Sequence, residues 1–294
     1  MPARSPAGWL DRLRQLEARG RVPLALLLSL LLLTVAAWWL TLYQATGMDM
    51  PMGVAARTGG DAMTGMGSGE MAGMAMSGIS VSGWSPSGAV YFVALWTVMM
   101  AAMMLPAAGP MIFMFASAQA RRDPSVSVPT WIFVAGYILV WAAAGVAVYV
   151  AVQAGSDVAT ALAPDAREKW GRLALGATIV AAGLYQFTPL KRVCLGHCRS
   201  PFAFVALHWR EGRVGALGMG LRHGAFCFGC CWALFAVLVA AGVMSVAWML
   251  LLTLVVFAEK VFPLGNRVAA AIGIVLIGLG LAVGSGAAAM PWLS

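Results

Sequence analysis

The chain has 294 residues, of which 61% are hydrophobic and only 10% charged, and its mean hydropathy is +0.85. This composition excludes an ordinary soluble domain, because several apolar runs reach the roughly 20 residues that cross a hydrocarbon core. The formal net charge of +8 could indicate nucleic-acid binding, but the basic residues are grouped by loop, and they therefore report membrane topology. The sequence predicts an all-α polytopic membrane protein that binds no nucleic acid.

About seven transmembrane helices are expected, because helices are the economical way to satisfy backbone polar groups in lipid at these lengths. The apolar segments fall near 22–45, 88–117, 130–153, 172–189, 224–242, 245–262 and 267–288. The chain then divides into a basic cytoplasmic tail (1–21), a first transmembrane anchor (22–46), a Met-rich external loop (47–86), and a six-helix metal-binding membrane core (87–290) that contains a cytoplasmic loop (190–222).

The distribution of Lys and Arg predicts the orientation. With the N-terminus in the cytoplasm, fifteen Lys and Arg residues lie in cytoplasmic segments and four in external ones, namely Arg57, Arg167, Lys169 and Arg172. Cytoplasmic loops carry the excess of basic residues in membrane proteins. We therefore expect a cytoplasmic N-terminus and an external C-terminus, in a multi-pass protein of the bacterial inner membrane.

The external loop is dominated by Gly, Ser and Ala and is expected to be disordered, since it has no apolar period from which to build a core. Eight methionines fall within 29 residues of it, whereas the average density of 19 in 294 would place about two there. Soft sulfur ligands select Cu(I) over Mg, Ca or Mn. The alternative is an inert linker. The candidate copper ligands of this loop are Met48, Met50, Met52, Met63, Met66, Met71, Met74 and Met76.

A second group of methionines lies in the segment near 88–117. At 100° per residue they share a helix face about 140° wide; they are Met99, Met100, Met103, Met104, Met111 and Met114. Pro106 and Pro110 are expected to kink this helix. Met99 and Met103 are candidate ligands on a path for a soft metal, and the alternative is that these flexible side chains serve packing.

The stretch "HGAFCFGCCW" carries the most specific signal. On a helix, His223, Cys227, Cys230 and Cys231 project from one face. A metal site needs ligands from separate directions, so a second element should complete it. The candidate is "CLGHCR", which places Cys194, His197 and Cys198 at the cytoplasmic end of the preceding span. All five cysteines then lie on one side of the membrane.

Clustered thiols in a partly dry, cationic setting suit Cu(I), with Zn(II) or an iron–sulfur cluster as less favoured metals. A disulfide is disfavoured, because the cytosol is reducing. The alternative is that the cysteines are small buried hydrophobic residues.

Four stretches, "WTVMMAAMMLP", "YQFTPLKRVCLGHCRSP", "GAFCFGCCW" and "EKVFPLGNR", give the chain a resemblance to a known family. It resembles the predicted metal-binding integral membrane proteins that were first described as domain of unknown function 2182. The resemblance covers roughly residues 88–288. It implies an integral membrane protein that binds a metal, and it implies no catalytic role.

The sequence therefore predicts a copper-handling membrane protein that transports Cu(I) or delivers it to a cuproenzyme during assembly. Its expected partners are the metal ion, the lipid bilayer and a soluble copper chaperone or client cuproenzyme. It contains no hydrolase elbow, P-loop or dinucleotide motif, which disfavours an enzyme. The alternatives are a thiol–disulfide or electron-transfer protein and a structural subunit. Glu259 and Lys260, which close the sixth span, are either functional or a snorkelling pair at the interface.

Overall fold

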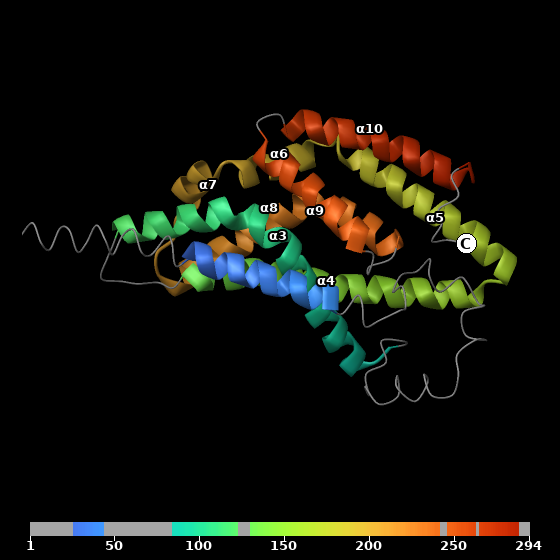
Figure 1. Ribbon diagram of the computed structural model, residues 1–294, viewed down its shortest axis with the longest axis horizontal. Helices are drawn as coiled ribbons and strands as arrows, with labels where there is room; N and C mark the ends of the chain where they lie inside the picture. Colours follow the sequence, from blue (N-terminus) through green and yellow to red (C-terminus); the bar gives the residue numbers. More distant parts are fainter. Residues whose placement is uncertain (1–25, 44–83, 123–129, 242–245, 263–264, 288–294) are drawn as a thin grey trace, which may run out of the picture.

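The computed structural model describes residues 26–43, 84–122, 130–241, 246–262 and 265–287 (Figure 1). All regular elements within these residues are helices, which confirms the all-α class. They are an N-terminal helix Leu26–Tyr43, α3 (Pro86–Arg122), α4 (Thr130–Ala161), α5 (Pro164–Tyr185), α6 (Pro189–Arg199), α7 (Pro201–His208), α8 (Gly212–Ala241), α9 (Val246–Val261) and α10 (Gly265–Gly284).

Five of the described helices are long and apolar enough to cross a membrane, and a sixth crossing results if α5 and α6, bent by 64°, form one span. These helices form a multi-pass set, as predicted, but among the described residues fewer than the expected seven transmembrane spans are long and apolar enough to cross a membrane. The difference lies in α9, which has 16 residues against the roughly 20 that a crossing requires. Seven crossings, the N-terminal orientation and the division into segments therefore stay predictions.

Two helix boundaries differ from the sequence prediction. The helix α8 begins at Gly212, not near 224, so the cysteines lie about four turns into it. The sequence GRVGALGMGLRH looks like a loop because of its glycines and arginines, yet one of these glycines, Gly220, allows α8 to pack closely on α4. The predicted span 172–189 ends at Tyr185, because Thr188 caps a new helix and Pro189 occupies its first turn.

Two pairs of helices form the closest contacts, and both pairs meet at glycines. Along α4 and α8, a Cβ on Gly136 would lie 2.5 Å from the carbonyl oxygen of Leu217, and one on Gly220 would collide with the carbonyl of Phe133. Along α5 and α10, a Cβ on Gly280 would lie 2.7 Å from the carbonyl oxygen of Gly176. Small residues let helix backbones approach closely in membranes.

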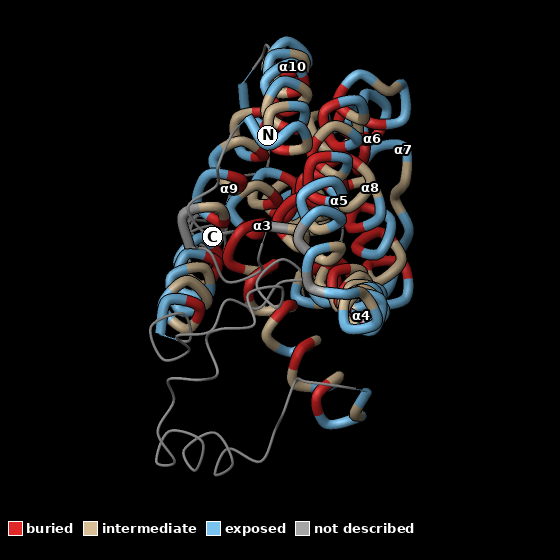
Figure 2. The backbone as a smooth tube through the Cα atoms, turned by 90° about the vertical axis from the view of Figure 1, so that its right-hand side faces the viewer, coloured by how far each residue is buried: buried red, intermediate tan, exposed pale blue. Residues whose placement is uncertain are grey.

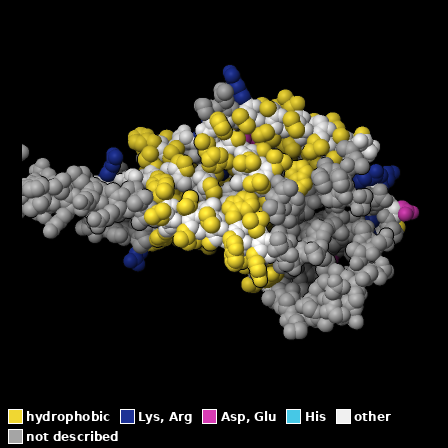
Figure 3. All heavy atoms as spheres, in the orientation of Figure 1, with side chains coloured by type: hydrophobic (Ala, Val, Ile, Leu, Met, Phe, Trp, Pro, Cys, Tyr) yellow, Lys and Arg dark blue, Asp and Glu magenta, His cyan; other side chains and the backbone are white. Residues whose placement is uncertain are grey.

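The molecule is apolar on the outside as well as in its core. Figure 2 shows buried stretches toward the centre of the bundle and exposed ones on its outer sides. Large apolar side chains such as Leu32, Val90 and Val275 are more than half exposed. Figure 3 shows hydrophobic side chains across the middle of the visible face, with Lys and Arg near its margins. This distribution suits a bundle whose outer surface faces lipid tails.

The helix α3 runs through both of its internal prolines, Pro106 and Pro110, and changes direction along its length (Figure 1). Its methionine face is turned into the bundle, where Met99, Met100 and Met103 are each at most 4% exposed. The Met-rich segment 48–76 lies outside the described residues.

The glycine contact between α4 and α8 provides a first prediction. Replacing Gly220→Ala should destabilise the protein by about 1–3 kcal/mol, because the new methyl group would overlap the Phe133 backbone. The matched control is Gly218→Ala on the same helix, where a Cβ would meet nothing within 4 Å. Thermal unfolding of the detergent-solubilised protein measures both. Equal melting temperatures for the two variants would contradict the close α4–α8 contact.

Candidate metal centre

The helix α8 presents four candidate ligands to the interior of the bundle. His223, Cys227, Cys230 and Cys231 are all at most 2% exposed, and the three cysteines are free thiols. Their spacing of three and four residues keeps them on one face of the helix. The neighbouring helices α4 and α6 cover this face, which removes the thiols from the lipid.

The helix α6 supplies the second set of cysteines, as the sequence predicted. Thr188 accepts a hydrogen bond from the backbone N–H of Lys191 and so caps α6 at its start. Residues spaced three and four apart along this helix face α8. One of them is Cys194, whose Sγ would lie 2.8 Å from a Cβ built on Gly229. Gly229 therefore makes room on α8 for the Cys194 thiol.

Four thiols from these two helices form a group. Cys198 on α6 approaches Cys227 and Cys230 closely enough for its thiol to interact with both. Cys230 and Cys231 each direct their thiols at the backbone carbonyl of Cys227, at 3.0 Å and 2.8 Å. We call Cys198, Cys227, Cys230 and Cys231 the thiol cluster. Cys194 lies beside it, and within the interaction range of Cys230.

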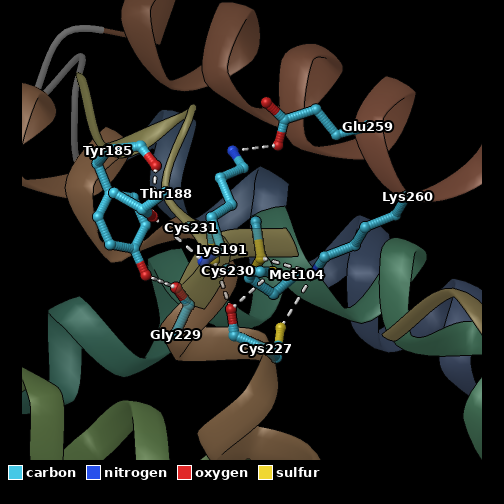
Figure 4. A network of polar contacts seen from close by, with 10 residues as sticks. All are labelled: Met104, Tyr185, Thr188, Lys191, Cys227, Gly229, Cys230, Cys231, Glu259 and Lys260. Carbon is cyan, nitrogen blue, oxygen red and sulfur yellow. Dashed lines mark hydrogen bonds and ion pairs between the residues drawn. The ribbon is translucent and has the colours of Figure 1, made fainter. Parts of the chain in front are cut away.

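The sulfur of Cys227 receives contacts from several helices, and Figure 4 shows Lys260 directed toward it. Besides the neighbouring thiols, the Tyr137 hydroxyl of α4 lies 3.2 Å from Cys227 Sγ, and Lys260 Nζ of α9 donates to it at 3.0 Å. Lys260 Nζ also lies 3.9 Å from the Met104 Sδ of α3. Residues from five helices thus converge around one sulfur atom.

A buried ion pair lies next to the cluster. Lys191 Nζ is 2.7 Å from Glu259 Oε2, and both side chains are 1% exposed. Lys260 is itself only 8% exposed. The interpretation of Glu259 and Lys260 as a snorkelling pair is therefore wrong, because both point into the protein. Sequence reasoning did not identify Lys191 as the partner of Glu259, since 68 residues separate them.

The histidines do not share one environment. His223 is buried against the Tyr137 ring at a centroid distance of 5.5 Å, and neither of its ring nitrogens has a hydrogen-bond partner in the described structure. His197 instead stacks on Phe226 at 4.1 Å and contacts the Val193 carbonyl through Nδ1. His223 thus lies on the cluster side of α8 with its nitrogens available, and His197 lies among aromatic rings.

Three residues near this centre were not predicted from the sequence to belong to it, namely Tyr137, Met104 and His208. His208 lies in α7, with its ring centroid 6.2 Å from that of His197. Met104 was recognised as part of the methionine face of α3, but nothing in its spacing distinguished it from Met99 or Met103. Only the approach of Lys260 from α9 distinguishes Met104 from these two residues.

The described residues contain no group of three or more His, Cys, Asp or Glu side chains that is already arranged to hold a metal ion. The geometry explains this result, because two thiols point at a backbone carbonyl and the Lys260 ammonium lies against Cys227. Metal binding by the cluster would require these side chains to rotate. The assignment of the cysteines, histidines and methionines as ligands stays a prediction.

Comparison with known proteins identifies the family. No match was found among curated proteins or among solved structures. A family model described as PpoB2, copper chaperone, matches residues 93–283. These residues include α4 to α9 whole and nearly all of α3 and α10, and they agree closely with the extent of the resemblance seen in the sequence. The family description thereby specifies copper as the metal that this multi-pass helical protein handles. The chain belongs to the PpoB2 copper chaperone family.

Proposed function

We propose that this protein binds copper as Cu(I) at the thiol cluster and passes it to a client cuproenzyme. The observation that carries the proposal is the convergence of Cys198, Cys227, Cys230 and Cys231 from two helices, three of them buried and Cys198 partly buried. Membership of the family indicates that the metal is copper. The donor atoms favour the Cu(I) oxidation state, because thiolates and thioethers are soft ligands that select Cu(I).

The surroundings of the cluster favour a soft monovalent ion over the alternatives. Among the described residues, the carboxylate beside this centre is Glu259, which is paired with Lys191 through Oε2, and one carboxylate falls well short of the several oxygen ligands that a hard ion such as Mg²⁺ or Ca²⁺ requires. Zn(II) requires four ligands in a tetrahedron, whereas Cys227, Cys230 and Cys231 come from little more than one turn of a single helix. A Cu(I) ion held by two or three sulfurs fits this donor set better, and the unpartnered imidazole of His223 is a further donor.

Several thiols at one depth also suit transfer rather than permanent storage. A free thiol can bind the copper before the previous sulfur dissociates, so the ion can move between sulfurs without becoming uncoordinated. Cys194 beside Gly229 extends the series of thiols beyond the cluster itself. The protein is proposed to reside in the bacterial inner membrane, with the cluster toward the cytoplasmic side, as the distribution of Lys and Arg indicates.

A second prediction tests the cluster. Replacing Cys227, Cys230 and Cys231 together by Ser should remove most of the copper that copurifies with the protein, because hydroxyls are poor ligands for Cu(I). Membrane insertion should be retained, since apolar length determines it. The measurement is copper per chain in the purified protein. The matched control is Ala233→Ser, which adds a hydroxyl at a buried position of α8 and removes no thiol.

Full copper content in the correctly inserted triple variant would exclude these cysteines as the site. If the intact protein instead contains no copper and its thiols oxidise in pairs under mild oxidant, a thiol–disulfide function would replace the proposal.

A third prediction concerns the Met-rich segment, which we propose captures external copper. Deleting residues 48–76 should impair copper-dependent activity of the client only when external copper is scarce, because clustered thioethers would raise the local metal concentration without building the permanent site. The measurement is a copper titration of cells that carry the deletion, the triple Ser variant or the intact chain. Identical titrations for the deletion and the intact chain would reduce the segment to a linker.

A further inference from the structure

Lys260 places a cation between two sulfur atoms in the core. Its Nζ lies 3.0 Å from Cys227 Sγ and 3.9 Å from Met104 Sδ (Figure 4). Cys227 belongs to α8, Met104 to α3 and Lys260 to α9, so three helices build this arrangement. All three side chains are buried, with Met104 and Cys227 at 0% exposure.

Met104 is an unusual neighbour for an ammonium group. A thioether is only a weak hydrogen-bond acceptor, and it gives little compensation for the cost of burying a charge. It is, by contrast, a good ligand for Cu(I). The two sulfurs therefore form a poor permanent site for an ammonium and a good one for a soft monovalent metal.

The nearby carboxylate offers Lys260 a second location. Glu259 Oε2 accepts from Lys191, whereas Glu259 Oε1 is buried with no hydrogen-bond partner in the described structure. The carboxylate also lies within electrostatic range of Lys260. An unpartnered buried acceptor is rare and costly. The flexible four-carbon stem of Lys260 would allow the ammonium to leave the sulfurs and approach this oxygen.

We propose that the Lys260 ammonium is an internal competitor of copper, and that Cu(I) binds between Cys227 and Met104 by displacing it. The inference rests on the proposed function and names both a further ligand, Met104, and the means of release. In this step Cys227 is the thiolate that accepts the Nζ–H···S hydrogen bond. When Cu(I) enters, bonds to the two sulfurs form, the hydrogen bond breaks and the ammonium keeps its proton. When a client removes the copper, the ammonium returns to Cys227. No electron is transferred in either direction.

The competing explanation is that Lys260 only stabilises the thiolate of Cys227 and so favours metal binding. The two explanations predict opposite signs for a neutral side chain at this position. A competitor, once removed, leaves copper bound more tightly, whereas a stabilising cation, once removed, leaves it bound more weakly.

The fourth prediction therefore uses Lys260→Gln, which keeps most of the length of the side chain, removes its charge and adds no sulfur. Full-length protein is loaded with Cu(I) in detergent, and a coloured Cu(I) chelator measures both the affinity and the rate of copper removal. Lys260→Gln should bind Cu(I) more tightly by about tenfold or more, the equivalent of one charge-assisted hydrogen bond, and should release it more slowly. Lys260→Arg, which keeps the charge, should remain close to the intact protein.

A pair of variants on α3 tests the ligand separately and does not depend on the folding of the lysine variants. Met104→Leu should weaken Cu(I) binding by about tenfold, while Met100→Leu, at an equally buried position one turn earlier, should leave it unchanged. Copper X-ray absorption should show the loss of one sulfur neighbour only in Met104→Leu.

Weaker or unchanged Cu(I) binding by folded Lys260→Gln would overturn the competitor role, and equal affinities of the two leucine variants would overturn the assignment of Met104 as a ligand. If Lys260→Gln does not fold, the leucine pair decides the shared site. Failure of the proposed function itself looks different, because then the intact protein would bind no Cu(I) and none of these comparisons would show a change.

Discussion

The buried sulfur of Cys227 is the point on which the arrangement of the bundle depends. It is contacted by the Tyr137 hydroxyl from α4, the Lys260 ammonium from α9 and the Cys198 thiol from α6, while its own helix α8 lies between them. Three helices thus direct polar groups at one atom of a fourth, inside an otherwise apolar protein. Burying so many polar groups is costly unless each has a partner, so their positions are mutually dependent.

The close packing of α8 on α4 makes this convergence possible. Glycines at the contact bring the two backbones together, and Tyr137 and Phe133 then lie over the face that carries His223 and Cys227. On the opposite side, Gly229 admits the Cys194 thiol, and its carbonyl accepts a hydrogen bond from the Tyr185 hydroxyl. Small residues on α8 therefore have two effects: they let the helix lie close to α4, and they leave space for the Cys194 thiol.

Charge in the core is arranged around the same centre. Two lysines and one glutamate are buried close together, and the Glu259 carboxylate balances the positive charge of Lys191. The other, Lys260, faces sulfur atoms instead of a carboxylate. In the proposed function, a buried cation beside a soft ligand would make the affinity for copper adjustable, because occupation of the site by one cation would oppose occupation by another.

The sequence by itself determined the class of the protein and the chemistry of its donors. Apolar runs gave a helical multi-pass bundle, and sulfur-rich stretches at helical spacing on two consecutive elements indicated a soft metal, because both signals are local in the chain. The tertiary structure alone decided that α8 begins at Gly212, that Glu259 pairs with Lys191, and that Met104 faces Lys260. Met104 and Lys260 are 156 residues apart, and such contacts depend on how helices pack, which no local pattern records.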